Sequence, residues 1–168
     1  MFSAELESQA ADVLDAARAK GLRLATAESC TGGLIAACLT AIAGSSDVID
    51  RGFIVYDNAA KTEMLGVSEA LLISHGAVSE EVARAMAEGA LARAHADIAV
   101  SCTGIAGPGG PTDGKPVGLV HLACARDGAT SHRCREYGDI GREAVRLRTV
   151  VDALALVATQ IIGVGEQK

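Results

Sequence analysis

The segment LRLATAESCTGGLIAACLTAIAG, residues 22–44, decides how the chain is expected to fold. It starts with a short apolar run, residues 22–26, that suits a buried β-strand. The run breaks at ESCTGG, residues 28–33, and the apolar stretch over residues 34–43 then predicts a largely buried helix. A strand that passes through a glycine-rich turn into a helix is a unit of α/β folds, so an α/β sheet is expected.

Strands and helices alternate along the rest of the chain. Helices are predicted near both ends, over residues 4–20 and 141–162, where apolar residues recur every three or four positions. Asp127-Gly128 is a strong hairpin signal, which makes the two strands around it antiparallel. The pattern predicts one domain over residues 1–168, a three-layer α/β/α fold with a mixed sheet. The remaining predicted elements are strands at 52–56, 97–103, 117–126 and 130–137 and helices at 58–65, 68–75 and 79–95.

The composition excludes several classes of protein. A chain of 168 residues with 49% hydrophobic residues has enough apolar surface for a real core, which excludes a disordered chain. The 15 basic and 21 acidic residues give a net charge of −6, and only 2% of residues are aromatic, which argues against a nucleic-acid partner. No signal-like start and no apolar stretch near the roughly 20 residues of a membrane span are present. A cytoplasmic protein without membrane contact is therefore expected.

The cysteines and histidines predict neither a disulfide framework nor a metal site. The cysteines are odd in number, form no C-x-x-C pair and fit reduced thiols. The histidines lie too far apart for the ligand spacing of a zinc site. These residues are Cys30, Cys38, Cys102, Cys124 and Cys134, and His75, His95, His121 and His132.

Two glycine-rich segments directly follow predicted strands. In ESCTGG, main-chain N–H groups could approach an anion or a developing oxyanion, although Ser29 or Thr31 would equally serve as a helix N-cap. TGIAGPGG, residues 103–110, forms a loop of a length that is more often functional than idle. Because ligands of α/β sheets bind at the carboxyl ends of strands, these segments predict a binding site.

Two further segments carry groups that could complete such a site. GSSDVIDRGFIVYDNAAK, residues 44–61, offers Ser46, then Tyr56 at the end of a strand and Lys61 about one helical turn later. A lysine can take a serine's proton when burial or positive charge lowers its pKa, whereas a solvated lysine and a capping serine are the ordinary alternatives. Arg142 starts the last helix, where a guanidinium beside free amides suits a phosphate; an exposed polar face is the alternative.

These strings together resemble one known family. ATAESCTGG, AGSSDVIDRGFIVYDNAAK, HGAVSEEVARAMAEGA, TGIAGPGGPTDGKPVG and GDIGREAVR are similar to the CinA C-terminal domain family, over about residues 5–162. Its stand-alone members are nicotinamide-nucleotide amidases, also called NMN deamidases. Longer members carry an additional domain similar to molybdopterin-binding proteins, which this sequence lacks. The resemblance therefore implies a single-domain amidase.

The implied reaction converts nicotinamide mononucleotide to nicotinic acid mononucleotide and ammonia in pyridine nucleotide recycling, without metal or organic cofactor. The resemblance implies a serine–lysine arrangement with Ser46 as nucleophile and Lys61 as base, supported by hydrogen bonds from Ser29 and Tyr56. If Ser46→Ala keeps activity while Ser29→Ala abolishes it, the two serines exchange roles. The expected substrate-binding residues are Thr31, Gly32, Gly33, Thr103, Gly104 and Arg142.

Two other functions stay open from the sequence. A nucleotide-binding or competence-associated regulatory module without turnover would carry the same glycine-rich loops. An amidase for a different nucleotide-like amide would use the same site, and Cys30 is a competing nucleophile although no histidine lies near it in sequence. Apolar helix faces and a mean hydropathy of +0.28 predict a homodimer or higher homo-oligomer.

Overall fold

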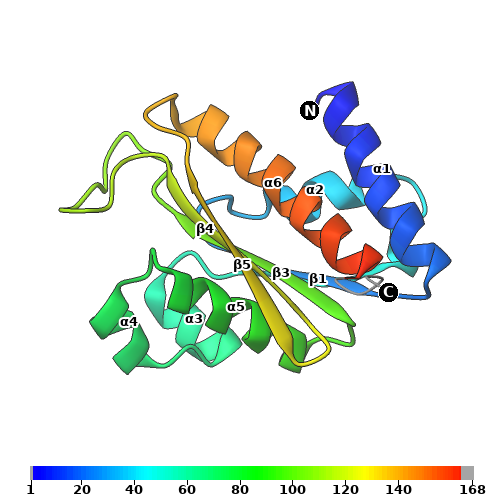
Figure 1. The fold of residues 1–168 in the computed structure, drawn as a ribbon, viewed down its shortest axis with the longest axis horizontal. Helices are drawn as coiled ribbons and strands as arrows, with labels where there is room; N and C mark the ends of the chain where they lie inside the picture. Colours follow the sequence, from blue (N-terminus) through cyan, green and yellow to red (C-terminus); the bar gives the residue numbers. More distant parts are fainter. Residues whose placement is uncertain (1, 164–168) are drawn as a thin grey trace, which may run out of the picture.

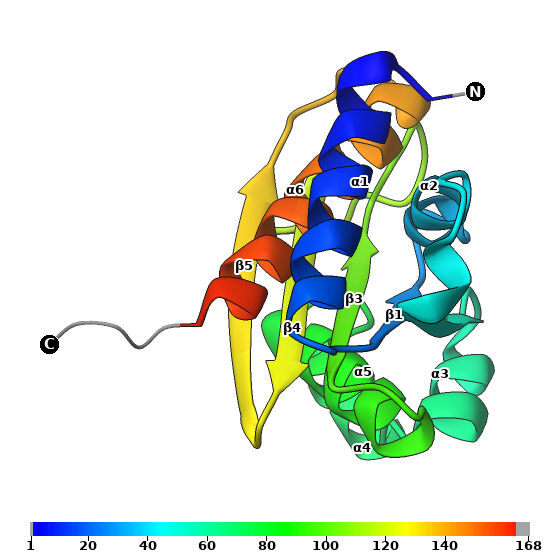
Figure 2. The same ribbon diagram turned by 90° about the vertical axis from the view of Figure 1, so that its right-hand side faces the viewer.

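The computed structural model describes residues 2–163, in which helices cover both faces of one sheet (Figure 1). The strands in chain order are β1 (Leu24–Glu28), β2 (Ile49–Ile54), β3 (Ile98–Gly104), β4 (Leu119–Arg126) and β5 (Ala129–Glu136). One helical layer consists of α1 (Ala4–Ala19), α2 (Leu34–Thr40) and α6 (Arg142–Ile162). The opposite layer consists of α3 (Asn58–Leu65), α4 (Glu69–His75) and α5 (Glu80–Arg93). This arrangement confirms the predicted α/β/α fold, and the view in Figure 2 shows both layers from the side.

The order of the strands brings three carboxyl ends to one edge of the sheet. The order is β2-β1-β3-β4-β5, with β1 parallel to β2 and β3, and with the β3–β4 and β4–β5 pairs antiparallel. The chain leaves β1 for β2 on one side and returns to β3 on the other, so β1 lies at a topological switch point. In register, Glu28 at the end of β1 is paired with both Ile54 and Cys102.

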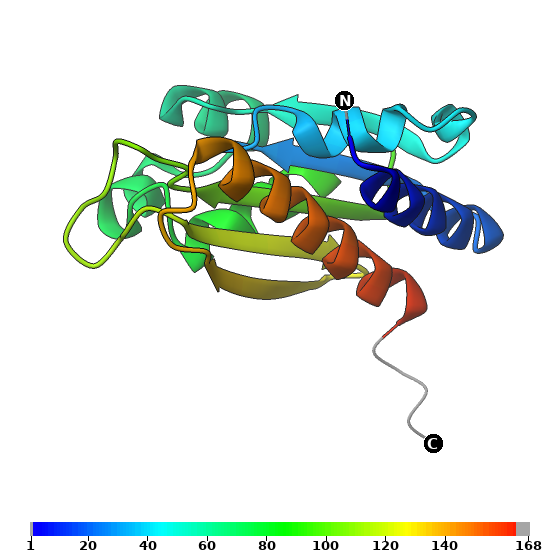
Figure 3. The same ribbon diagram turned by 90° about the horizontal axis from the view of Figure 1, so that it is seen from above.

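Each helical layer encloses its own apolar core against the sheet. Leu14, Leu39 and Leu154 are buried between the sheet and the α1, α2 and α6 layer, where Figure 3 shows α1 and α6 lying across the strands. Val55 and Met86 are buried on the other face. All five residues of β1 are buried because the strand is covered on both faces, which explains its apolar sequence.

The hairpin is confirmed, whereas two strand boundaries differ from the prediction. Asp127 and Gly128 both have positive φ, 52° and 75°, as a type I′ turn between β4 and β5 requires. β1 starts and ends two residues later than predicted, and β2 starts at Ile49 rather than Gly52. Parallel pairing with β1 determines which residues form β2. This pairing joins distant parts of the chain, so the local sequence does not predict the strand boundary. Within residues 2–163, no helix combines the length and apolar character needed to cross a bilayer.

Candidate active site

A cavity of about 200 Å³ lies where β1, β2 and β3 end. Parallel strands place their carboxyl ends at the same edge of a sheet, so segments far apart in sequence meet here. Six of the predicted site residues line this cavity: Ser29, Tyr56, Lys61, Thr103, Gly104 and Arg142. The early serine-bearing turn, the lysine and the glycine-rich loop thus share one cavity.

Ser29 is held at the end of β1 by main-chain hydrogen bonds on both sides. Its N–H donates to the carbonyl of Cys102 at 3.1 Å, and the N–H of Val55 donates to the carbonyl of Glu28 at 2.9 Å. The Ser29 side chain is nearly buried, at 8% exposure, and lines the cavity. Among the described residues, no group hydrogen-bonds to its hydroxyl, so the hydroxyl is free to meet a ligand.

Lys61 is the second chemical group of the cavity, and it is buried rather than solvated. Its side chain is 1% exposed, and its Nζ donates to the carbonyls of Val55 at 3.0 Å and Tyr56 at 3.3 Å. Burial lowers the pKa of Lys61, and the nearby Asp57 carboxylate opposes this effect only in part. A neutral amine needs only two N–H groups for these two carbonyls and keeps a lone pair that can accept a proton.

Local structure explains how Lys61 reaches this position. Asp57 is the N-cap of α3 and accepts the N–H of Ala59 at 2.8 Å, which starts the helix directly after β2. Lys61 then follows after one turn, and its side chain reaches back to the last residues after the strand. The two carbonyls that hold its Nζ are thus supplied by the chain segment that enters the helix.

Arg142 connects three segments at the cavity. Its guanidinium donates to the carbonyl of Gly107 at 3.0 Å and to the hydroxyl of Tyr56 at 3.0 Å. The first contact reaches the glycine-rich loop and the second reaches the end of β2. The side chain of Tyr56 itself is 61% exposed, so this contact lies at the open side of the cavity.

Thr103 and Gly104 form the wall that β3 contributes. The Thr103 side chain is 1% exposed and its hydroxyl donates to the carbonyl of Ala77 at 2.8 Å. The oxygen still has lone pairs that can accept an N–H from a ligand. A Cβ at position 104 would lie 2.7 Å from Cγ2 of Val120 and 2.8 Å from the carbonyl of Leu119, so β3 and β4 approach too closely here for a side chain.

Ser46, the predicted nucleophile, does not line the cavity. It lies exposed in a 3₁₀ turn, Ser45–Asp47, before β2, whereas Tyr56 and Lys61 come after β2. The six residues of β2 span about 20 Å, so Ser46 is at the opposite edge of the sheet. Ser29 is the predicted serine that the fold brings to Lys61.

Thr31, Gly32 and Gly33, the expected substrate contacts in the first turn, also lie away from the cavity. None of the three lines the cavity. The buried Thr31 hydroxyl and the Gly33 N–H both donate to the Glu28 carboxylate, at 2.6 and 3.0 Å, and the Gly32 N–H donates to the carbonyl of Ser29. These donors are used within the protein and are not available to a ligand.

Comparison with known proteins agrees with this fold. The family model of the CinA C-terminal domain matches residues 6–161. The chain belongs to the CinA C-terminal domain family. The nicotinamide-nucleotide amidohydrolase PncC of Enterobacter agglomerans is 48% identical over 164 residues, which cover 96% of this chain and 99% of that protein. The family resemblance predicted from the motifs is therefore confirmed.

Two further relatives show how this CinA domain occurs elsewhere. The crystal structure of the competence/damage inducible protein CihA from Agrobacterium tumefaciens has a TM-score of 0.92 and 53% identity, covering 94% of this chain and 96% of that one. The CinA-like protein of Synechococcus sp. (strain RCC307) is 50% identical over 161 residues, 95% of this chain. This CinA domain spans only 39% of the length of that longer relative.

Cys30 lines the same cavity of the CinA domain, but its thiol is a poor nucleophile. A hydrogen bond with Cys102 and burial raise the pKa of Cys30 well above its ordinary value, and the Glu28 charge adds to the effect. The thiol is therefore neutral, and the thiolate is the reactive form. Within residues 2–163, no group of three or more His, Cys, Asp or Glu side chains is placed to hold a metal ion.

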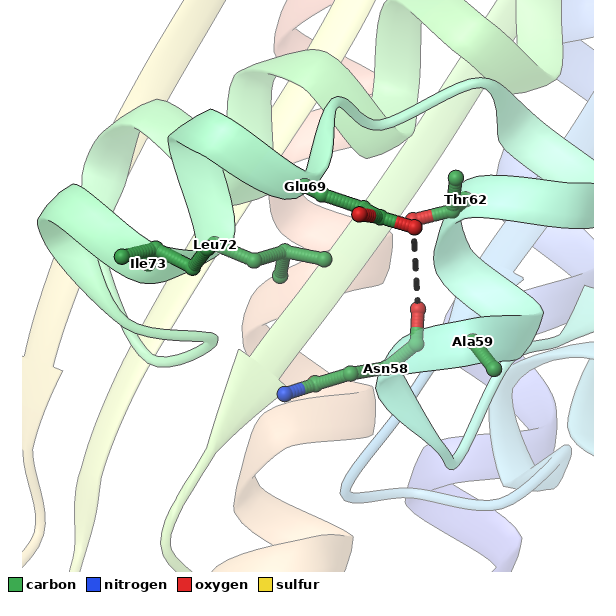
Figure 4. A pocket seen from close by; sticks show the side chains of 6 residues that line it. All are labelled: Asn58, Ala59, Thr62, Glu69, Leu72 and Ile73. Carbon is green, nitrogen blue, oxygen red and sulfur yellow. Dashed lines mark hydrogen bonds between the residues drawn. The ribbon is translucent and has the colours of Figure 1, made fainter.

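Two cavities flank the central one in this CinA domain. One of about 350 Å³ lies between α3 and α4 and shares Asn58 with the central cavity; Figure 4 shows Asn58, Thr62, Glu69 and Leu72 around it. The other, of about 450 Å³, lies at the start of α6 and shares Arg142. Neither has a serine or a lysine in its wall, whereas the smaller central cavity has both.

Sequence reasoning missed Asn58 and Glu28. Asn58 starts α3 and reaches two cavities, and nothing in its local sequence distinguishes it from a helix-start residue. Glu28 had a visible signal: it is a charged residue at the end of an otherwise apolar strand, and the structure buries it completely. A buried charge needs partners, which should have indicated a structural role.

Proposed function

We propose that this CinA domain hydrolyses the carboxamide of nicotinamide mononucleotide to nicotinic acid mononucleotide and ammonia. The observation that carries the proposal is the buried Lys61, whose pKa is lowered by burial, in the same cavity as the free hydroxyl of Ser29. The printed name of the relative from Enterobacter agglomerans, nicotinamide-nucleotide amidohydrolase, supports this choice of substrate. The place of the reaction in pyridine nucleotide recycling belongs to the same proposal.

In the proposed reaction, Ser29 is the nucleophile and Lys61 the base. The Ser29 oxygen attacks the carboxamide carbon while the Lys61 amine takes the hydroxyl proton, and the amine then returns that proton to the leaving nitrogen. Ammonia leaves, and water hydrolyses the acyl-enzyme to the acid with Lys61 again as base. This chemistry needs no cofactor, because the two side chains supply both the nucleophile and the proton transfer.

Main-chain groups beside Ser29 can stabilise the developing oxyanion. The N–H of Cys30 follows the nucleophile directly, the usual place of an oxyanion donor in serine hydrolases. Within residues 2–163, this N–H donates to no main-chain carbonyl. Thr103, whose own proton is donated to Ala77, has lone pairs that can accept an N–H of the carboxamide.

Charge decides which flanking cavity takes the phosphate of the substrate. The cavity at the start of α6 has Arg142 and Arg146 in its wall and one carboxylate, Glu143. The cavity between α3 and α4 has Glu69 in its wall and no basic residue. A phosphate is therefore expected on the α6 side, with the nicotinamide ring in the central cavity and Arg142 between the two.

The test is ammonia release from nicotinamide mononucleotide by the wild type and by Ser29→Ala, Ser46→Ala and Lys61→Ala. We expect turnover by the wild type and Ser46→Ala, and a loss of at least 10³-fold in Ser29→Ala and Lys61→Ala, since removing one member of such a pair costs about this much. Retained activity in Ser29→Ala with loss in Ser46→Ala would refute the assignment of the nucleophile.

The same assay separates the proposal from its alternatives. A wild type that binds the mononucleotide but releases no ammonia is a binding or regulatory module. A wild type that prefers nicotinamide riboside or the dinucleotide is an amidase for a different amide. These assays all use the wild-type protein, so a difference in activity reflects the substrate alone.

The single domain over residues 1–168, the cytoplasmic location and the homo-oligomer remain predictions. Ile54 and Ile73 are 55% and 85% exposed, which suits a surface that a second copy covers. Light scattering of the purified chain tests this point, and a monomer at all concentrations would contradict it.

A further inference from the structure

The Glu28 carboxylate is completely buried beside the proposed nucleophile. Its side chain is 0% exposed, and it accepts the N–H groups of Gly33 and Ile35 at 3.0 Å each and of Ala36 at 2.8 Å. The Thr26 and Thr31 hydroxyls also donate to it, at 3.2 and 2.6 Å. No ion pair to Glu28 is present in residues 2–163, so hydrogen-bond donors alone compensate its burial.

These bonds join both ends of the turn that carries Ser29. Glu28 precedes Ser29 directly, and four of its five donors lie three to eight residues later, in the turn and in the first turn of α2. The carboxylate therefore closes the turn around Ser29, while the Ser29 N–H is fixed to β3 through Cys102. The main chain at Ser29 is held from both directions.

A short chain of hydrogen bonds within the core also ends at this carboxylate. The Thr31 hydroxyl gives its proton to Glu28, which accepts only, so the Cys102 thiol, 3.0 Å from the Thr31 oxygen, must be the donor in that contact. The Cys102 thiol and the Thr31 hydroxyl are thus ordered toward a single buried acceptor.

We infer that Glu28 is a positioning residue of the proposed amidase: its buried carboxylate fixes the 29–33 turn, and with it the Ser29 hydroxyl, for attack. The inference rests on the proposed function, because it assigns Glu28 an effect on Ser29 chemistry. Glu28 does not line the cavity. A change at Glu28 is therefore expected to alter kcat rather than substrate binding.

The first experiment compares Glu28→Gln with wild type in the ammonia assay. The amide of Gln presents N–H groups to main-chain N–H donors, so the turn loses part of its support. We expect kcat to fall by 10- to 100-fold, the effect of a misplacement of about 1 Å, with KM changed by less than threefold. Asp152→Asn is the matched control: this half-buried carboxylate accepts from Tyr137 and Arg135 outside the cavity, and its loss should leave kcat unchanged.

A second pair of variants keeps the inference testable if Glu28→Gln does not fold. Thr31→Val removes the shortest bond to the carboxylate, whereas Thr31→Ser keeps the hydroxyl. We expect kcat to fall in Thr31→Val and to be restored in Thr31→Ser, both measured below the unfolding temperature of each variant. A destabilised but fully active Thr31→Val would overturn the inference.

The outcomes distinguish the inference from the proposed function. If the wild type releases no ammonia, the proposed function and the inference about Glu28 are both refuted. If Ser29→Ala is inactive while Glu28→Gln and Thr31→Val keep the wild-type kcat, the proposed function stands and the positioning role of Glu28 is refuted. A rise in KM with unchanged kcat would likewise refute it.

Discussion

Arg142 and Tyr56, 86 residues apart in the chain, are joined by a hydrogen bond of 3.0 Å at the central cavity. The same guanidinium donates to the carbonyl of Gly107, so one side chain connects the start of α6, the end of β2 and the glycine-rich loop. Two directed bonds from a planar fork are a property of arginine that lysine does not share.

Replacing Arg142 by lysine should therefore weaken substrate binding. A lysine keeps the positive charge but cannot reach both partners, so KM for nicotinamide mononucleotide is expected to rise by at least 10-fold, about 1.4 kcal/mol. KM for nicotinamide riboside, which has no phosphate, should change little. Steady-state kinetics with both substrates is the measurement. Arg148→Lys, at an exposed position of the same helix, is the control and should behave as wild type.

Lys61→Met should separate activity from stability. The variant has no base, so ammonia release should fall by at least 10³-fold. Burial lowers the pKa of Lys61, which means that the folded state disfavours the charged amine, and an apolar side chain of similar length removes this penalty. The unfolding temperature at pH 7 should therefore equal or exceed that of the wild type. An unstable Lys61→Met would show that the amine supports the fold through its two carbonyl contacts.

The same lowered pKa predicts two pH dependences. Activity should rise with pH through the pKa of Lys61, because only the neutral amine accepts the Ser29 proton. Between that pKa and the ordinary value of 10.5, the unfolded state binds more protons, so wild-type stability should rise with pH relative to Lys61→Met. kcat/KM profiles and denaturant unfolding across this window measure both effects. A pH-independent stability difference would contradict the lowered pKa.

A histidine pair on β4 and β5 predicts sensitivity to acid. His132 Nδ1 faces the Glu80 carboxylate at 3.3 Å, and its Nε2 lies 3.0 Å from His121 Nδ1. Because the carboxylate only accepts, neutral His132 carries its proton on Nδ1 and accepts from His121 on Nε2. A second proton on His132 would break the contact with His121. Burial lowers the pKa of both rings, so the unfolded state binds more protons below pH 6.5.

Stability is therefore expected to be full above pH 6.5 and to decrease as the pH falls toward the lowered pKa values. His132→Gln keeps one donor and one acceptor but has no group that titrates in this range. Its unfolding temperature should decrease less between pH 7 and pH 5 than that of the wild type. If the unfolding temperatures of the two proteins decrease equally with pH, the histidine pair does not govern acid stability.

Gly89→Ala tests the packing of α5 against α3, the helix that carries Lys61. A Cβ at position 89 would lie 2.1 Å from the carbonyl of Leu65 at the end of α3. On helix propensity alone the substitution would stabilise α5 by about 1 kcal/mol. The clash reverses the sign, and we expect destabilisation by about 1–3 kcal/mol with reduced activity. Chemical denaturation measures the free energy of unfolding, and a stabilised variant would contradict this packing.

The local sequence was sufficient to predict the helices and strands and their order along the chain. Apolar periodicity located α1 and α6, the Asp127-Gly128 turn located the hairpin, and the alternation of strands and helices predicted the α/β/α layers. These features depend on interactions between near neighbours in the chain, which is why they can be read from it. The motifs also sufficed to identify the family and six residues of the cavity.

The tertiary structure alone decided which of these groups meet. In the sequence Ser46 is nearer to Lys61 than Ser29 is, but parallel pairing of β1 with β2 puts Ser29 at the carboxyl edge of the sheet and Ser46 at the opposite edge. Burial of Lys61 and Glu28 is equally invisible locally, since it depends on elements brought from elsewhere in the chain. Side-chain identity follows from the sequence, whereas proximity and desolvation, which set reactivity, arise only when distant segments pack together.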